Sequence, residues 1–371
     1  MRRGAIIEVA EAAPAVARVI AEIKKFSKDA ATNIYAAIGT TQIRVQTSRG
    51  IVAVSRTDSE IYQDDIERVV KASQAIQLAP NRMVIHSITR EFIVDGAADI
   101  IDPLGLKGNR LESNSLIVDA FAPHVRNVMR SVELGLGEVS GLVFTPLAIA
   151  RSVISKAQKN LGTVLISIGS GTTGVAIFEE NKLWGVAQFP VGGANISGDI
   201  AIGLKIPIDV AEKIKREYGF AVARDIHSKD MIDLATIMPD GRGMVSRRLV
   251  AEIIQSRLDE IFELVSQEIK LAGKAGQLAG GALLVGGTSM LPGISDLARQ
   301  ELKLTVQLGS IIPQDWIIET TPAQQYIEDP DFAGAAGLIL SGMDLEDKGK
   351  TKGFTLPGIS KVKELFKYFM P

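Results

Sequence analysis

The sequence predicts a mixed α/β fold with more than one domain, and three observations lead to that prediction. The chain has 371 residues, of which 46% are hydrophobic, and chains of this length usually divide into two or more domains with substantial cores. Stretches with apolar residues at helical spacing alternate with short β-branched runs that are typical of strands. Two of these runs lead into glycine-rich segments, at 169–171 and 286–287.

Charge and residue content exclude several classes of function. The chain carries 41 basic and 43 acidic residues, so no overall field attracts nucleic acid, and none is expected as a partner. There is no cysteine, which excludes disulfides and thiol catalysis. No run approaches the roughly 18 apolar residues of a membrane span, and acidic residues at 8 and 11 exclude a signal peptide. His86, His124 and His227 lie far apart without companion ligands, so no metal-binding cluster is expected.

The first part of the chain predicts helices around a small group of strands. Apolar residues at i, i+3, i+4 and i+7 spacing predict an amphipathic helix that starts near Pro14 and ends with Lys24 and Lys25, which suit the helix dipole. The same criteria predict further helices at 64–78, 123–134 and 146–158. Alternating or continuous apolar runs predict strands at 34–45, 50–54, 84–88, 91–94 and 116–122, with a Gly/Pro turn region at 103–110.

Helices dominate the second part. A hairpin of two apolar strands at 165–178 is followed by a third strand at 183–191 and, much later, by a buried strand at 280–287. Helical periodicity predicts helices at 196–204, 207–218, 246–271 and 331–340. The charged, glycine-containing stretch at 341–356 is typical of a flexible linker.

The strongest candidate site is the turn within the first hairpin. It consists of Gly169, Ser170, Gly171, Thr172 and Thr173. The glycines allow positive φ angles and a close approach of an anion to the backbone, while the threonines supply hydroxyl donors. The pattern therefore predicts a phosphate-binding turn, although an ordinary hairpin turn has a similar composition.

Two other segments could complete such a site. Gly286, Gly287 and Thr288 follow the buried strand, and bare backbone there would let a base or ribose lie against it, although a plain strand-to-helix turn would look the same. The helix at 211–219 carries Glu212 and Lys215, whose simpler interpretation is a solvated charged face. Together the three segments predict a nucleotide held between separate parts of the chain.

Over nearly its whole length the chain resembles the FtsA family, the actin-like bacterial division proteins. Residues 167–178 resemble its second phosphate loop, and 190–193 with 199–201 resemble the segment that follows. Residues 211–219 match its AE-x-IK-x-x-YG helix, 284–293 its adenosine loop and 329–338 its closing helix. The most diagnostic segment is 102–112, which ends in Arg110-Leu111-Glu112, because related sugar kinases, heat-shock chaperones and actins lack this inserted subdomain.

The resemblance implies an actin-like two-lobed ATPase fold with an inserted SHS2-type αβ subdomain and a C-terminal amphipathic helix. It implies subdomain 1A at 1–32, 140–160 and 325–344, the insertion 1C at 33–139, 2A at 161–192 and 271–324, and 2B at 193–270. A linker at 345–357 and a membrane-targeting helix at 358–371 would follow. Phosphates would contact 169–173, the adenosine Gly286, Gly287 and Thr288, and the ribose and base Glu212 and Lys215.

Two departures from the family pattern bear on the chemistry. The family's second phosphate loop carries acids at the positions of Ser167 and Gly174, where they help to place Mg²⁺ and the attacking water. Their absence predicts that ATP, with Mg²⁺, is bound with weak or no hydrolysis.

The second departure is that the family's first phosphate loop falls before residue 1. The segment 37–44 imitates it, but has Ala37 at the acidic position and continues into the insertion. We expect either a start upstream or a truncation, which would leave sheet edges unpaired, solubility poor and ATP binding weak.

The last residues predict a short helix that lies on a membrane surface. An apolar arc is flanked by Lys361 and Lys363 and includes Ile359, Val362, Leu365, Phe366 and Phe369. A charged stretch before it favours docking on an anionic membrane over the alternative, a frayed terminal core helix. One such helix binds weakly, so stable attachment would need several copies in a polymer.

The resemblance therefore implies a cell division protein at the cytoplasmic face of the cell membrane, at the division site. It would self-polymerise, bind the FtsZ C-terminal peptide through the helical part at 193–270, and recruit other divisome proteins through the insertion. Candidate arginines for the acidic groups of that peptide are Arg247, Arg248 and Arg257, although a solvated helix face explains them equally well. The alternatives are a PilM-like scaffold of type IV pilus machines and a sugar kinase, for which no catalytic Asp follows the turn.

Overall fold

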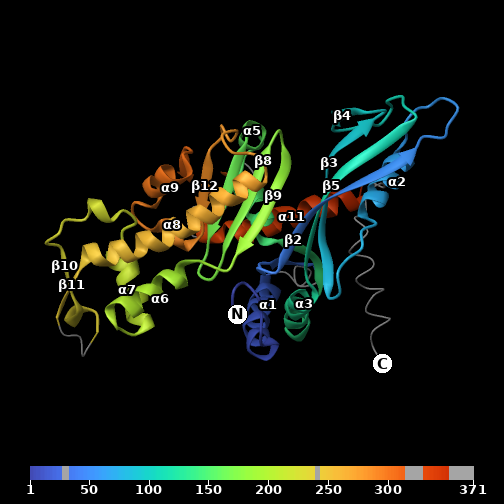
Figure 1. Ribbon diagram of the computed structural model, residues 1–371. Coiled ribbons are helices and arrows are strands. Elements are labelled where there is room, and N and C mark those ends of the chain that lie inside the picture. The colour runs from blue at the N-terminus through green and yellow to red at the C-terminus, as the bar shows by residue number, and fades with distance from the viewer. Residues whose placement is uncertain (27–32, 239–242, 314–328, 351–371) are drawn as a thin grey trace. The chain divides into compact units, whose positions relative to one another are not determined.

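The computed structural model describes residues 1–26, 33–238, 243–313 and 329–350 (Figure 1). The chain forms two compact units. The first contains Ala5–Thr145 and the described residues 338–350, and the second contains Pro146–Gly337 with Arg2–Gly4. No helix in the described ranges is long and apolar enough to cross a membrane.

One part of the first unit is a pair of helices against a parallel strand pair. The helix α1 (Val9–Phe26) and the helix α3 (Ala122–Leu134) flank β1 (Ile34–Ile38) and β6 (Val139–Phe144), which pair in parallel. Ile20 of α1 and Val132 of α3 are buried together there. The helix expected to start near Pro14 begins at Val9 with Pro14 inside it, because residues 10–13 are good helix formers that extend the helix toward the N-terminus.

The other part of the first unit is a four-stranded antiparallel sheet covered by one helix. The strands lie in the order β2 (Ile43–Ala53), β5 (Arg110–Phe121), β3 (Arg82–Val94) and β4 (Ala97–Ile100). The helix α2 (Gln63–Gln74) packs against the sheet, with Val69, Val70 and Leu111 among the buried residues. The strand predicted at 34–45 is broken between β1 and β2. The two strands predicted at 84–88 and 91–94 are one strand, β3, whose pairing with β5 shifts after Val84 and after Thr89.

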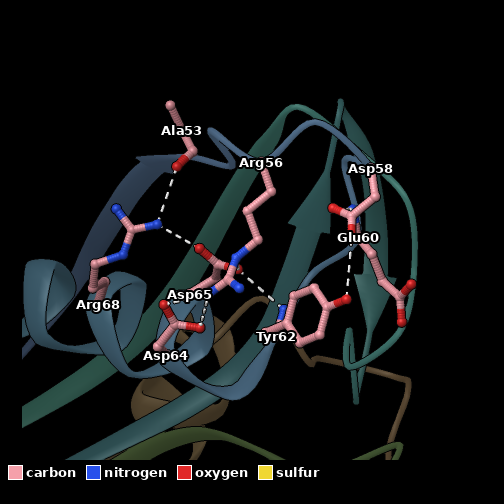
Figure 2. A network of polar contacts seen from close by, with 8 residues as sticks. All are labelled: Ala53, Arg56, Asp58, Glu60, Tyr62, Asp64, Asp65 and Arg68. Carbon is pink, nitrogen blue, oxygen red and sulfur yellow. Dashed lines mark hydrogen bonds and ion pairs between the residues drawn. The ribbon is translucent and has the colours of Figure 1, made fainter.

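The start of α2 is fixed by a polar network (Figure 2). The buried Asp65 carboxylate accepts a hydrogen bond from the Tyr62 backbone N–H at 3.1 Å and pairs with Arg68. Arg56 binds both oxygens of Asp64, at 2.6 and 2.7 Å, and lies 4.3 Å from the centre of the Tyr62 ring. Burial raises the pKa of Asp65, but these hydrogen bonds outweigh it and lower the pKa below its ordinary value.

The segment 110–112 alternates between the two faces of the sheet. Leu111 is fully buried in the core under α2. Glu112 is also buried, with its side chain 2% exposed, and it pairs with Arg49 and Arg110, which are each more than half exposed. A buried carboxylate is tolerated when such partners neutralise it. The diagnostic Arg110-Leu111-Glu112 segment thus has a structural role in the inserted sheet.

His86 of β3 joins the inserted sheet to β6. Its Nε2 accepts a hydrogen bond from the backbone N–H of Phe144 at 2.8 Å, which requires the neutral ring. Burial lowers the pKa of His86 to about 4. His86 therefore serves as a buried structural acceptor in the described structure.

His86 predicts a pH dependence of stability. Because its folded pKa lies below that of the unfolded chain, the unfolded state takes up the proton first as the pH falls from about 6.5 to about 4. The free energy of unfolding should fall by up to about 3 kcal/mol over that window. His86→Gln, which keeps an acceptor, should flatten the curve measured by chemical denaturation, whereas exposed His227→Gln should leave it unchanged. A curve that is equally steep in His86→Gln would contradict this assignment.

The second unit is built on a five-stranded mixed sheet. Its order is β13 (Val306–Leu308), β12 (Ala282–Val285), β7 (Thr163–Ile168), β8 (Thr173–Glu179) and β9 (Lys182–Phe189). The strands β7, β8 and β9 form the predicted antiparallel meander, and β12 runs parallel to β7. Residues from this sheet and from the helices between β9 and β13 form the largest buried core.

Three helices of the second unit agree closely with the periodicity of the sequence: α6 (Gly193–Leu204), α7 (Ile208–Tyr218) and α8 (Arg247–Leu271). A further helix, α9 (Ile294–Leu302), follows the loop after β12, and Figure 1 shows α8 and α9 in orange beside β12. Between α7 and α8, short elements include the strand pair β10 (Met231–Asp233) and β11 (Met244–Ser246).

Two predictions about helix ends are wrong. The helix predicted at 146–158 is two helices, α4 (Thr145–Val153) and α5 (Lys156–Leu161), because Ser155 caps a new helix by accepting the Gln158 N–H at 3.2 Å. The linker predicted from 341 is helical to Lys350, as part of α11 (Ala333–Lys350). Leu, Met, Glu and Lys in that stretch favour a helix, and each glycine costs only about 1 kcal/mol.

Candidate nucleotide site

The predicted phosphate turn joins β7 to β8 and is held against the start of α6. The Gly169 N–H donates to the Thr172 carbonyl at 3.0 Å, which closes the turn. The first amides of α6 then hold the turn, because Gly193 N–H donates to Gly169 O at 2.9 Å and Ala194 N–H donates to Ser170 O at 2.7 Å. A Cβ on Gly192 would lie 2.5 Å from Gly169 O. The glycine before α6 therefore permits a close approach of two backbones.

The glycines in the turn do not act as the sequence suggested. Neither Gly169 nor Gly171 has a positive φ. A Cβ on Gly171 would meet nothing closer than 3.9 Å, and one on Gly169 nothing closer than 3.5 Å. Their contribution is a backbone bare of side chains, which is what an anion needs in order to approach the turn.

The two threonines differ. Thr173 is fully buried, and its hydroxyl donates to the Val191 carbonyl at 2.8 Å, which ties β8 to the end of β9. Thr172 is half-buried, and Ser170 is exposed at the tip of the turn. The expectation that both threonine hydroxyls face a ligand therefore does not fit Thr173, whose hydroxyl is used within the fold.

Lys215 and Glu212 lie on one face of α7 and contact the start of α6. The Lys215 ammonium donates to Gly193 O at 3.0 Å, Ser197 Oγ at 2.9 Å and Glu212 Oε2 at 2.6 Å. These three bonds use all three donors of the group. Lys215 thus fixes the start of α6, which in turn holds the phosphate turn. The Glu212 side chain remains 44% exposed.

Glu212 remains ionised because of this network. Burial raises the pKa of Glu212, but hydrogen bonds from Lys215 and Ser197, with the charges of Lys215 and Arg216, lower it below its ordinary value. Ser197 Oγ donates to Glu212 Oε2 at 2.5 Å. A half-exposed carboxylate of fixed orientation is suited to accept hydroxyl groups, as a ribose would present.

The loop after β12 contacts the same turn. Thr288 Oγ1 donates to Gly169 O at 3.3 Å, and a Cβ on Gly193 would lie 2.4 Å from Thr288 Oγ1. Gly286 has φ 88° and ψ 160°, a conformation available essentially to glycine alone, and its Cα faces Ile168 O. Gly287 lies beside Asp331 of the 3₁₀ turn Pro330–Phe332. The structure therefore brings together all three segments that the sequence singled out.

Sequence reasoning missed one residue at this site. Ser167 on β7 pairs with Gly174 on β8, and Gly174 pairs with Gln188 on β9. Gln188 is therefore a direct neighbour of Gly174, and Ser167 lies on the other side of Gly174 in the same row. The only sequence signal for it was its strand position, two residues before the Pro190 turn.

The three candidate arginines have different surroundings. Arg247 Nε donates to the Tyr218 carbonyl at 3.0 Å, and Arg248 pairs with Glu252 on the same helix at 3.4 Å. Arg257 binds Asp199 of α6 with two hydrogen bonds, at 2.7 and 2.9 Å, and also pairs with Glu260. These bonds raise the pKa of Arg257, the hydrogen bond to Asp199 contributing most.

Arg257 lines a surface groove between α6 and α8. The groove has a volume of about 440 Å³ and is lined by Asp199, Ile202, Gly203, Ile253, Ser256, Arg257 and Glu260. Ile202 is 78% exposed, so its apolar side chain is accessible at the edge of the groove. An exposed apolar residue beside a charged pair is a suitable docking site for a short peptide. The predicted membrane-binding residues 359–369 lie outside the described residues.

The fold and the site define an actin-like α/β protein with an inserted SHS2 domain. The solved structure titled "PilM-PilN type IV pilus biogenesis complex" matches with a TM-score of 0.61 and 16% identity, over 92% of this chain and 88% of that chain. The family model "Cell division protein FtsA" matches residues 164–337, and "SHS2 domain inserted in FTSA" matches 40–119.

Curated relatives agree with the family models. The chain is 30% identical to the cell division protein FtsA of Borreliella burgdorferi, over 98% of this chain and 86% of the relative. It is 29% identical to FtsA of Bacillus subtilis, over 96% of this chain and 79% of the relative. The chain belongs to the FtsA family of cell division proteins.

Proposed function

We propose that this chain binds ATP, assembles with its own copies and tethers FtsZ filaments to the cytoplasmic face of the cell membrane at the division site. The observation that carries the proposal is the convergence of the turn at 169–172, the α6 start and Thr288 in a chain of this family. These segments leave bare backbone and polar groups where a nucleotide would be held. Other divisome proteins would bind the inserted SHS2 domain.

The proposed nucleotide site favours binding over hydrolysis. Gly169, Ser170, Gly171 and Thr172 would contact phosphates, Gly286, Gly287 and Thr288 the adenosine, and Glu212 the ribose. Ser167 and Gly174 provide no carboxylate to coordinate Mg²⁺ or to activate water. We therefore assign weak or no ATPase activity, with nucleotide acting on assembly.

We assign the groove between α6 and α8 to the C-terminal peptide of FtsZ. Ile202 and Ile253 would contact apolar residues of the peptide. Arg257 would share its guanidinium between Asp199 and an acidic group of the peptide, since the guanidinium has five donors. Arg248 is exposed near the start of α8 and supplies further positive charge, whereas Arg247 is engaged with Tyr218.

The proposed membrane binding rests on the sequence at 359–369, which has an apolar arc with flanking lysines. A PilM-like pilus scaffold is the second candidate, supported by the similarity of fold. The family membership favours cell division, and an amphipathic terminal segment distinguishes a membrane tether from a scaffold anchored through a protein partner.

One co-sedimentation experiment tests both proposed interactions, with FtsZ and with the membrane. The full chain is mixed with FtsZ filaments and anionic vesicles, and each component is measured in the pellet. Ile202→Glu should weaken FtsZ recruitment about tenfold or more and leave vesicle binding unchanged. Phe366→Glu with Phe369→Glu should abolish vesicle binding while FtsZ binding persists.

A matched control is Leu271→Glu, which changes an apolar residue that is 82% exposed at the C-terminal end of α8, outside the groove. It should change neither FtsZ recruitment nor vesicle binding. Recruitment of FtsZ by Ile202→Glu at the level of Leu271→Glu would reject the groove assignment. Vesicle binding that survives the double change would reject the tether.

A further inference from the structure

Three residues form a row across the sheet beside the phosphate turn. Ser167, Gly174 and Gln188 are direct partners on β7, β8 and β9. Directly opposed residues in antiparallel strands have their side chains on the same face. Gly174 is the second residue of β8, immediately after the turn and Thr173. The row therefore lies at the turn end of the sheet.

Gln188 occupies the space that a side chain at position 174 would need. A Cβ on Gly174 would lie 2.9 Å from Gln188 Oε1 and 2.7 Å from Pro146 Cγ. Both contacts are shorter than van der Waals distance, so an acid at 174 would not fit without displacing them. The carboxylate of the family pattern is thus replaced by an amide from the neighbouring strand.

The amide oxygen of Gln188 is buried and lacks a hydrogen-bond donor among the described residues. A buried acceptor without a donor is costly, and such atoms usually mark an ordered water or a functional site. A Cβ on Gly171, in the nearby turn, would meet only the backbone of Arg3, at 3.9 Å, so no side chain fills that position. The hydrogen-bond partner of Gln188 Oε1 must therefore be a donor that the described residues do not supply.

We propose that Gln188 is a positioning residue for the nucleotide, whose Oε1 accepts a hydrogen bond from a water in the hydration shell of phosphate-bound Mg²⁺. The inference rests on the proposed ATP binding. Mg²⁺ keeps several of its waters in protein sites, so a second-shell acceptor can hold it without a carboxylate. An amide accepts a hydrogen bond but takes no proton, which supports binding and gives no general base.

The test combines two measurements on Gln188→Met. Without nucleotide, the variant should melt about 2 °C higher than the wild-type chain, because an apolar side chain of similar length removes the unpaired buried oxygen. The dissociation constant for ATP with Mg²⁺ should rise about fivefold, the effect of one lost water-mediated bond. The dissociation constant for ATP with EDTA should not change.

Two further variants make the result specific. Ser87→Ala removes another buried polar atom without a partner in the described structure, a hydroxyl oxygen in the inserted sheet. It should raise the melting temperature without changing either dissociation constant. Gln188→Glu keeps an acceptor and should bind ATP with Mg²⁺ within about twofold of the wild type. If Gln188→Met does not fold, Gln188→Ala tests the same loss of affinity.

The outcomes separate the inference from the function on which it rests. A Gln188→Met protein that binds ATP with Mg²⁺ as the wild type does would overturn the role of Gln188 and leave ATP binding intact. Equal weakening with Mg²⁺ and with EDTA would also overturn it, because the metal hydration shell would then not be involved. A wild-type chain that binds ATP in neither condition would reject the nucleotide site itself.

Discussion

Gly286→Ala is expected to lower the free energy of unfolding by about 3 kcal/mol and to abolish measurable ATP binding. At φ 88° and ψ 160° an alanine is strained by roughly 1–3 kcal/mol. Its Cβ would also lie 2.7 Å from Ile168 O, and this overlap adds roughly another 1 kcal/mol or more. Ile168 is the last residue of β7, so relief of the overlap would displace the phosphate turn itself.

The measurement is denaturant unfolding together with ATP titration. Gly198→Ala is the matched control, because a Cβ there meets nothing within 4 Å and the position lies inside α6. The control should be neutral or slightly stabilising, since alanine favours a helix more than glycine does. A Gly286→Ala protein with the stability of Gly198→Ala would show that the loop after β12 does not require glycine.

Lys215→Met is expected to destabilise the chain by roughly 2–3 kcal/mol and to weaken ATP binding. The change removes the donor to Gly193 O and Ser197 Oγ and the positive charge beside Glu212. Each lost bond from a charged group costs roughly 1.5 kcal/mol, and the partly exposed Glu212 recovers some of this by solvation. Because Gly193 holds Gly169, looser packing of α6 also loosens the turn.

The pH dependence provides an independent check on Lys215. The depressed pKa of Glu212 gives stability that is present above the unfolded pKa and is lost as the pH falls through the folded value. The difference in stability between the wild type and Lys215→Met should therefore shrink below about pH 4.5. Lys213→Met, on the exposed side of the same helix, should change stability by less than about 0.5 kcal/mol at any pH. A constant difference across this range would exclude the Glu212 pairing as its source.

Several features of this protein were predictable from sequence because they depend on neighbouring residues. The spacing of apolar residues predicted α7 and α8 to within a residue or two, and β-branched runs predicted the β7–β8–β9 meander. The motifs at 102–112, 167–178 and 284–293 indicated the FtsA family, which the family models and relatives confirm. Local patterns predicted the ends of helices less well. Ser155 begins a new helix inside the helix predicted at 146–158, and Pro14 lies inside α1 and not at its start.

Other features depended on residues distant in sequence, and only the tertiary structure decided them. Periodicity indicates which residues are apolar, but not which partners a polar side chain meets. Hence it could not show that Thr173 and Lys215 use their donors within the fold, or that Arg257 pairs with Asp199. The register of β8 with β9 placed Gln188 against Gly174, in the space that a side chain at position 174 would need. That juxtaposition arises from strand pairing, which sets distances between residues that the linear sequence leaves unspecified.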